Sequence, residues 1–311
     1  MRTTPVALFL AGLLAVSMPA LSAAPRALWV WEGDTESLVL DPAAADQAIA
    51  LARREGVRTF YLYADSFQDH NLISDQPQKW QQLLRRLHAA GISVHALLGS
   101  AYLHTEGYVL PENRKQALAM VERVLLFNAR TASVDARFDA IHFDIEPHQL
   151  PQWDSDRDGL LREFLDLGQA YMDLKRKLGS DIPVGPDIPF WLDGISLSWQ
   201  GQTRSVAEHA IRLFDFVTLM DYRNRAEGSD GIIAHAQDEM DLAKRLGRRV
   251  IIGVETGDGE LPKVTFQGRT HAEMEQELAS TEAAFRDNPA FAGFAIHHYA
   301  TWQAWLKRNG R

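Results

Sequence analysis

A carboxylate pair and an imidazole alternate along one short segment near the middle of the chain. Within residues 138–147, His142, Asp144 and Glu146 occupy every second position, and the positions between them are apolar. A period of two predicts a β-strand with one apolar and one polar face, which Pro147 ends just after Glu146. Neighbouring carboxylates perform general acid–base chemistry when they lie in a buried site. The alternative is a half-exposed edge strand that carries ordinary surface charges.

The elements around this segment help to decide between a buried site and an exposed edge strand. Predicted strands and helices alternate along the whole chain. The hydrophobic patterns predict eight strands, at residues 27–32, 57–64, 93–99, 138–146, 182–191, 214–222, 249–256 and 291–299. Each strand is followed by a predicted helix, at residues 41–55, 77–90, 111–131, 158–178, 205–213, 230–246, 271–286 and 301–308. With no linker between them, these elements predict one α/β domain over residues 25–311, a (β/α)8 TIM barrel. An open doubly wound sheet is the alternative, but no GxGxxG turn or Walker lysine supports it.

A barrel gives the carboxylates a definite place, because the active sites of TIM barrels lie at the C-terminal ends of the strands. The residues expected at that end are Trp31, Glu32, Asp65, Asp144, Glu146, Asp187, residues 220–223, Glu255 and residues 297–299. Carboxylates that converge on one rim repel one another, so the pKa of at least one should rise, as a general acid requires. We expect Glu146 to be that acid. Four tryptophans expected in or beside the rim loops either offer ring faces on which a ligand stacks or simply pack: Trp153, Trp191, Trp199 and Trp302.

Composition narrows the classes of function. The chain has 311 residues, 46% of them hydrophobic, which is enough to bury one large core, and its net charge is −9 at pH 7. Because there is no basic stripe, neither a nucleic acid nor an anionic membrane surface is expected as a partner. The absence of cysteine rules out disulfides, thiolate catalysis and zinc–sulfur sites. No cofactor and no metal is predicted, and a monomer is the default.

One acidic segment leaves two interpretations open. Residues 154–159 read Asp-Ser-Asp-Arg-Asp-Gly and resemble the first half of a calcium loop, but the twelfth position is Leu165 instead of a bidentate glutamate. The other interpretation is an acidic N-cap for the helix that follows.

The N-terminal residues have the composition of a secretory signal peptide. Arg2 supplies a positive charge, residues 6–16 are apolar, and residues 20–24 are mostly small, as at a cleavage site. The apolar stretch is too short for a comfortable membrane span. We therefore expect residues 1–24 to be removed from a bacterial protein that is periplasmic or secreted and has no membrane anchor after cleavage.

Two segments carry a family resemblance. Residues 139–146, DAIHFDIE, resemble the DxxDxDxE strand-four signature of the chitinase-like family 18 glycoside hydrolases, and residues 220–222, MDY, resemble the M-x-Y element of their sixth strand. The resemblance implies a TIM barrel that hydrolyses a carbohydrate containing N-acetylhexosamine. It further implies that Glu146 protonates the glycosidic oxygen, that Asp144 orients the substrate's own 2-acetamido group as nucleophile, and that Tyr222 assists.

The chain departs from this signature at several positions. The middle Asp is His142, the usual Gly is Ala140, and the usual Trp before the acid is Ile145. Arg223 follows the tyrosine where Asp is common, and the strand-eight Trp that floors the sugar site is replaced near His297. The histidine of strand four either relays charge to the next carboxylate or is a satisfied core residue. The residues predicted to bind substrate are Trp31, His142, Asp187, Asp221, Arg223, Glu255 and His297.

Two further functions fit the same residues. Many sugar-cleaving barrels carry an acid/base glutamate on strand four and a nucleophilic glutamate on strand seven, which are the places of Glu146 and Glu255. Glu255 is then the nucleophile of a double displacement, or otherwise a carboxylate that only supports its neighbours. Chitinase-like barrels that lack the acid bind sugars without cleaving them. The altered residues around Glu146 keep such non-catalytic binding as an alternative.

Overall fold

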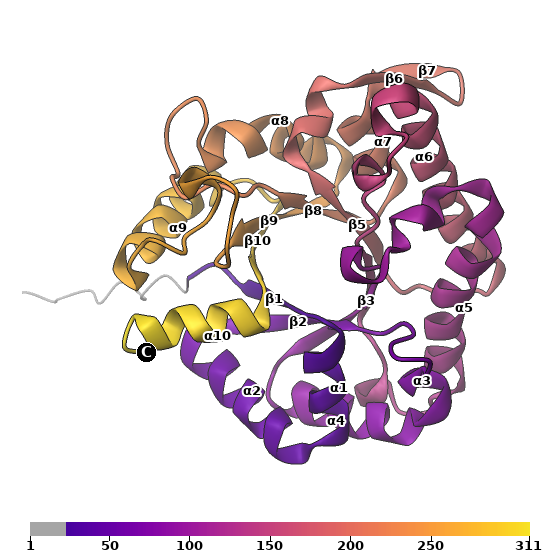
Figure 1. The fold of residues 1–311 in the computed structure, drawn as a ribbon, viewed down its shortest axis with the longest axis vertical. Helices are drawn as coiled ribbons and strands as arrows, with labels where there is room; N and C mark the ends of the chain where they lie inside the picture. Colours follow the sequence, from indigo (N-terminus) through magenta and orange to yellow (C-terminus); the bar gives the residue numbers. More distant parts are fainter. Residues whose placement is uncertain (1–22) are drawn as a thin grey trace, which may run out of the picture.

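Eight parallel strands form a closed barrel in the computed structural model, which describes residues 23–311 (Figure 1). The strand order is β1-β10-β9-β8-β5-β4-β3-β2. The strands are β1 (Arg26–Val30), β2 (Val57–Tyr63), β3 (Ser93–Leu98), β4 (Ala140–Phe143), β5 (Val184–Pro189), β8 (Phe216–Met220), β9 (Arg249–Glu255) and β10 (Phe291–His297). The predicted (β/α)8 TIM barrel is confirmed, and the open doubly wound sheet is wrong. The predicted signal peptide falls almost entirely on residues outside the described ones.

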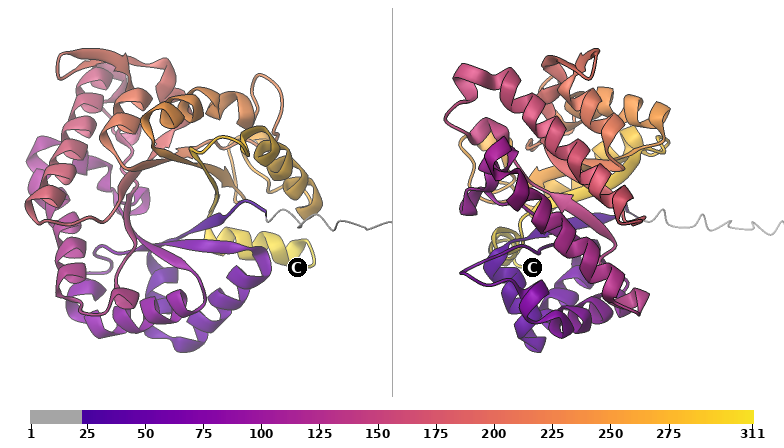
Figure 2. Two further views of the ribbon diagram at one scale, coloured as in Figure 1. Left: turned by 180° about the vertical axis from the view of Figure 1, so that it is seen from behind. Right: turned by 90° about the vertical axis from the view of Figure 1, so that its right-hand side faces the viewer.

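Helices surround the barrel and return the chain to the same end after each strand (Figure 2). The main ones are α2 (Pro42–Glu55), α4 (Pro77–Ala89), α5 (Arg114–Arg130), α6 (Trp153–Lys177), α7 (Val206–Leu213), α8 (Ile232–Leu246), α9 (His271–Phe285) and α10 (Tyr299–Arg308). Their ends follow local sequence signals. The Asp41 side chain accepts a 2.8 Å hydrogen bond from the amide of Ala43 at the start of α2, and Gly56 and Gly247 end α2 and α8 in the left-handed conformation. Within residues 23–311, no helix has both the length and the apolar composition needed to cross a membrane.

Several elements differ from the sequence predictions. The first predicted strand was too long, because Glu32 already begins α1 (Glu32–Leu40), a helix with hardly any amphipathic pattern. The fourth strand was predicted to reach Glu146, but β4 ends at Phe143. The short helix α3 (Leu72–Asp75) and a hairpin of β6 (Ser196–Trp199) and β7 (Gln202–Ser205) were not predicted. These differences lie in or next to the connections between strands and helices, where no periodic hydrophobic pattern predicts the structure.

The barrel interior is filled by large aromatic rings. Trp29, Tyr61 and Phe216 form one buried cluster inside the strands, separate from the larger apolar core between the strands and the helices. Glycines on the inward face make room for these rings. A Cβ atom on Gly185 would collide with Phe216, and one on Gly253 would press on the indole of Trp29. The interior is therefore packed with side chains, as in other TIM barrels, and the mouth lies above it.

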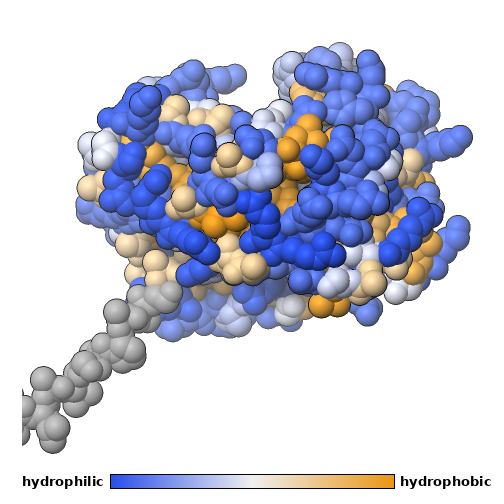
Figure 3. All heavy atoms as spheres, turned by 90° about the horizontal axis from the view of Figure 1, so that it is seen from below, coloured by the Kyte–Doolittle hydropathy of each residue, from blue (hydrophilic) through white to orange (hydrophobic). Residues whose placement is uncertain are grey.

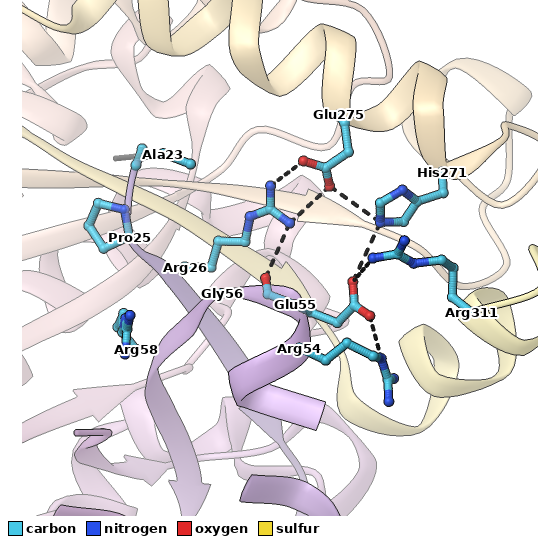
Figure 4. Close-up of a pocket in the computed structure, with 11 residues that line it drawn as sticks. Ala23, Pro25, Arg26, Arg54, Glu55, Gly56, Arg58, His271, Glu275 and Arg311 are labelled. Carbon is cyan, nitrogen blue, oxygen red and sulfur yellow. Dashed lines mark hydrogen bonds and ion pairs between the residues drawn. The ribbon is translucent and has the colours of Figure 1, made fainter. Parts of the chain in front are cut away.

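Ion pairs join the ends of the chain at the N-terminal end of the barrel, around a hollow of about 390 Å³ (Figure 4). Arg26 of β1 donates to both carboxylate oxygens of Glu275 on α9, at 2.9 and 2.5 Å. The buried carboxylate of Glu55, the last residue of α2, lies 3.5 Å from His271 and 3.6 Å from Arg311. These contacts connect the first strand with the last helices, which suits the stabilising role of this face in TIM barrels.

Gly99 lies directly after β3 with a φ of +88°, and a Cβ atom there would collide with the carbonyl oxygen of Asp144. We expect Gly99→Ala to lower the free energy of unfolding by roughly 2 kcal/mol or more, because alanine meets both backbone strain and a clash. Urea unfolding measures the change. Gly194→Ala is the matched control, since nothing lies within 4 Å of its added atom. An equal loss of unfolding free energy in Gly99→Ala and Gly194→Ala would contradict the predicted strain and clash at Gly99.

Candidate active site

The segment after β4 delivers Asp144 and Glu146 to the C-terminal mouth of the barrel. The amide of Asp144 donates to the carbonyl oxygen of Leu98 at 2.8 Å, so the pairing with β3 continues one residue beyond the strand. The chain then leaves the sheet, and Pro147–Gln149 forms a 3₁₀ turn. Figure 3, a side view of the barrel, shows the surface hollowed between two lobes at its upper edge, the side on which the strands end.

Glu146 holds its proton under neutral conditions. Burial raises the pKa of this carboxyl to about 9, helped by the nearby charges of Asp144, Asp187 and Glu106. The Gln149 side chain donates a 2.5 Å hydrogen bond to its Oε1. A carboxylic acid that is still protonated near neutral pH is able to donate that proton to a substrate.

Asp144 lies beside Asp187, and neither carboxyl has an ion pair with lysine or arginine in the described part of the chain. The register pairs Phe143 of β4 with Pro186 of β5, so the following residues of the two strands are neighbours on the inward face. Burial, followed by the charge of Asp187, raises the pKa of Asp144 well above its ordinary value. Its Oδ1 atom is buried and has no hydrogen-bond partner among residues 23–311.

Asp187 is held from two other strands. Its Oδ2 accepts a 3.0 Å hydrogen bond from Trp29 Nε1, and its Oδ1 lies 2.6 Å from His142 Nε2. Both Asp187 and His142 are buried, and burial lowers the pKa of His142 to about 3, so its imidazole is neutral. His142 is therefore a core histidine bonded to Asp187, and neither side chain reaches the open mouth.

Tyr222 stands among the carboxylates, on the segment after β8. Burial raises the pKa of its phenol well above the ordinary value, as do the charges of Glu255 and Asp144. Its ring centroid lies 5.8 Å from that of His297. The hydroxyl therefore stays protonated and able to donate a hydrogen bond.

The surroundings of Glu255 lower its pKa, whereas those of Glu146 raise it. Burial alone would raise its pKa, but hydrogen bonds from His297 and from two backbone amides lower the pKa below its ordinary value. His297 Nδ1 lies 2.6 Å from Oε2, while the amides of Thr256 and Gly257 bond Oε1 at 2.7 and 2.5 Å. Trp31 Nε1 donates to His297 Nε2 at 3.1 Å, which leaves the imidazole proton on Nδ1, facing Glu255.

Asp221 and Arg223 turn away from this group. Asp221 is fully buried and bonds His235 of α8 at 3.1 Å. Arg223 donates to Asp230 at 2.8 Å and lies over the ring of Phe190. Their contacts stabilise the loop after β8, and their predicted role in substrate binding stays a prediction.

Sequence reasoning missed several residues that surround the acid. Trp29 was detectable, because it lies two residues before Trp31 in the strand predicted at residues 27–32 and therefore on the same face. Glu106 lies in the 3₁₀ segment Thr105–Val109 after β3, where no pattern indicates that it faces Glu146. The position of His148 beside the acid was not predicted either: its Nε2 is 3.3 Å from a carboxylate oxygen of Glu146.

Two of the rim tryptophans lie near the acid. The rings of Trp153 and Trp191 have centroids 5.9 Å apart, and His148 contacts both rings. Trp302 is wholly buried in the first turn of α10, directly after β10, so it packs and offers no open ring face. Trp199 donates a hydrogen bond to Asp166 on the outer helix α6.

The acidic segment at residues 154–159 lies at the start of α6, which is kinked at Asp156, a residue with non-helical backbone angles. The Asp156 side chain accepts a 3.2 Å hydrogen bond from the amide of Gly159, which supports the capping interpretation. Across residues 23–311, no group of three His, Asp or Glu side chains is arranged to hold a metal ion.

The sequence comparisons give little. No family model matches the chain. Among curated proteins, exonuclease subunit 1 of Enterobacteria phage T4 is 28% identical over 102 residues, which is 32% of this chain and 29% of that protein. The chain therefore matches less than a third of that relative's length, and so short a match carries no functional argument.

Solved structures share the fold. A β-galactosidase from the psychrophilic Marinomonas ef1 has a TM-score of 0.55 and 10% identity, with 88% of this chain and 54% of that chain covered. The GH1 β-glucosidase from Exiguobacterium antarcticum B7 has a TM-score of 0.50 and 15% identity, covering 81% and 76%. A GH18 chitinase from Cycas revoluta, in complex with (GlcNAc)3, has a TM-score of 0.50 and 11% identity, covering 91% and 98%. At these identities the likeness shows the TIM-barrel fold.

The raised pKa of Glu146 makes stability depend on pH. The folded state keeps this proton up to about pH 9, whereas the unfolded chain loses it near its ordinary value of 4.5. Its contribution to stability is therefore complete below pH 4.5 and is lost as the pH rises to about 9. Glu146→Gln abolishes this loss, so the variant should gain on the wild type by up to about 1.4 kcal/mol per pH unit in that window.

Urea unfolding at about pH 5 and about pH 8 measures this gain. Glu273→Gln is the control. Hydrogen bonds from Thr270 lower the pKa of Glu273, so it is ionised in the folded state at both pH values and its loss should be equal at both. A Glu146→Gln difference that does not change with pH would show that the acid is not protonated.

Proposed function

We propose that this chain is an exported glycoside hydrolase that cleaves a polysaccharide or oligosaccharide containing N-acetylhexosamine. The observation that carries the proposal is the position of Glu146, two residues after Asp144 at the C-terminal mouth of a TIM barrel, where burial and neighbouring acids raise its pKa to about 9. This is the end at which such barrels hold their active sites. The signal-peptide composition of residues 1–24 supports export to the periplasm or beyond.

Glu146 is the general acid of the proposed reaction. It donates its proton to the glycosidic oxygen as the bond to the anomeric carbon breaks and an oxocarbenium-like transition state develops. Gln149 fixes one oxygen of the carboxyl, and His148 lies beside the other. Because burial also lowers the pKa of His148, that imidazole is neutral and does not draw the proton away.

Asp144 is the residue that positions the nucleophile. No hydrogen bond within residues 23–311 engages its carboxyl, and its second oxygen, unlike Oδ1, is not buried, so that oxygen suits the N–H of a substrate acetamido group, whose oxygen then attacks the anomeric carbon from the opposite side. The Tyr222 hydroxyl, which stays protonated, donates to the same acetamido group. The likeness of residues 139–146 and 220–222 to family 18 motifs supports these assignments.

The substrate class follows from the same site. An acetamido nucleophile requires a 2-acetamido sugar at the cleaved residue, and the Cycas chitinase that shares this fold was solved with (GlcNAc)3. The half-buried rings of Trp153 and Trp191, next to His148 at the rim, offer faces on which sugar rings stack. A carbohydrate is therefore the proposed partner.

A protein nucleophile is the second candidate. The lowered pKa of Glu255 keeps it ionised, as a nucleophile for double displacement must be. However, three hydrogen-bond donors already engage its two oxygens, and they restrain its approach to an anomeric carbon. We therefore place Glu255 as the carboxylate that orients His297 and, through it, Trp31.

Glu146→Gln tests the acid directly. The variant should lose roughly 10²–10⁴-fold in the rate of cleavage of N-acetylhexosamine oligomers, because the amide has no proton to donate at neutral pH. Release of reducing ends by purified wild-type and variant protein measures this. A variant that keeps most of its activity would rule out Glu146 as the acid. A wild-type protein that binds such oligomers without cleaving any would favour the sugar-binding alternative.

The two nucleophiles are separated by a pair of variants. If the acetamido group attacks, Asp144→Asn should cost several orders of magnitude in rate, Glu255→Gln should cost far less, and a thiazoline that mimics the cyclised intermediate should bind tightly. If Glu255 attacks, its replacement should be the severe one, and a fluorosugar should trap an adduct on it. Mass spectrometry of a glycosyl adduct on Glu255 would overturn the acetamido mechanism.

A further inference from the structure

A polar column passes through the centre of the barrel below the proposed catalytic carboxyls. The ring of Tyr61 stacks on His142 with centroids 4.0 Å apart and on His95 at 5.0 Å. The edge of Trp29 meets the same tyrosine at 5.2 Å. At the top of this column lies Asp187, the carboxyl of the group. Its two oxygens bond Trp29 and His142, and the residue is buried below the open mouth.

The hydrogen bonds and the strand register show where the negative charge of Asp187 lies and which carboxyl it faces. Trp29 Nε1 is a donor only, so Asp187 accepts at Oδ2. His142 is neutral, and its Nδ1 is buried without a partner in the described residues, so its single proton belongs on Nε2, facing the carboxylate. The imidazole therefore does not cancel the charge of Asp187. The strand register places that charge next to Asp144, two residues before Glu146.

We propose that Asp187 is a positioning residue: held by Trp29 and His142, its buried carboxylate acts through Asp144 to keep the proton on Glu146. This inference rests on the proposed role of Glu146 as the acid. Two carboxyls in one water-poor site resist ionising together, so the charge on one keeps the other protonated. Burial raises the pKa of Asp187 as well, well above its ordinary value, but its two hydrogen-bond donors favour its ionised form over that of Asp144, whose Oδ1 has no donor, so Asp187 ionises first of the pair. The raised pKa values of Asp144 and of Glu146, to both of which the charge of Asp187 contributes, agree with this order.

Other titratable groups also face these two carboxyls, and the test must separate them from Asp187. Glu146 is faced by Asp144 on its own segment, Glu106 after β3, His148 after Pro147 and Tyr222 after β8. Asp187 is faced by His142 on β4, Tyr61 on β2 and His297 on β10. A change confined to Asp187 leaves all the others in place.

Asp187→Asn removes the charge and keeps the shape. The new amide accepts from Trp29 with its oxygen and donates to His142 Nε2 with its nitrogen, while the imidazole proton moves to Nδ1. Carbon-13 NMR titration of the Glu146 carboxyl in the free protein, assigned by its loss in Glu146→Gln, should show the pKa falling by about one unit or more. Asp215→Asn is the matched control, because that carboxylate also has two donors, Lys175 and the amide of Val184, but lies at the N-terminal end of the barrel. It should leave the Glu146 titration unchanged.

A Glu146 titration that is the same in Asp187→Asn and the wild type would overturn the proposal. If the variant does not fold, the wild type still decides: its Glu146 signal should show a second inflection at the pH where Asp187 ionises, and a single-step curve would overturn the proposal. Because the titration uses no substrate, its failure is distinct from a failure of the proposed hydrolase activity, which reducing-end release measures.

Discussion

The constraint on which the site depends is the burial of several carboxyls without a cationic partner. Asp144, Glu146 and Asp187 lie at the C-terminal ends of adjacent strands, and no arginine or lysine in residues 23–311 forms an ion pair with any of them. Water is too scarce there to support three negative charges, so protons must remain on some of these groups at neutral pH. A group that keeps its proton at the pH where its substrate is stable is what general acid catalysis requires. The proposed acid catalysis thus depends on the absence of lysine and arginine partners for these carboxyls.

Such a site needs a scaffold that prevents the carboxyls from moving apart. The barrel supplies it through aromatic rings in its interior, where Gly185 and Gly253 make room for Phe216 and Trp29. Trp29 has two roles: its ring fills the centre of the barrel, and its Nε1 donates a hydrogen bond to Asp187. Gly99 performs the corresponding task at the rim, where the absence of a side chain allows the Asp144 backbone to approach β3. Packing and electrostatics are consequently coupled at the same few positions.

The sequence predicted what depends on periodic patterns. All eight barrel strands follow from their alternation, and Asp144, Glu146 and Tyr222 were expected at the mouth because each lies at the end of a strand. Features without a periodic hydrophobic pattern were not predicted. They are α1, the β6–β7 hairpin, and the position of Glu106 in the loop after β3. The bond between His142 and Asp187 was also missed, because it depends on the register between β4 and β5 and on which rotamers fit around Tyr61. The roles of all these residues in binding and catalysis stay predictions, as does the signal peptide.

Glu146 and Glu255 lie at the same mouth of the barrel, yet the pKa of one is raised and that of the other is lowered. Glu146 receives one side-chain hydrogen bond and faces other acids, so its pKa rises, whereas Glu255 receives two backbone amides and the Nδ1–H of His297, so its pKa falls. Burial raises the pKa of both, and the difference lies in the number of donors and in the neighbouring charges. Titratable groups whose surroundings drive their pKa values apart are the pattern from which an acid and its ionised counterpart are assigned. Because the donors on Glu255 also fix its oxygens in place, the same contacts that keep it ionised make it better suited to orienting His297 than to attacking a sugar.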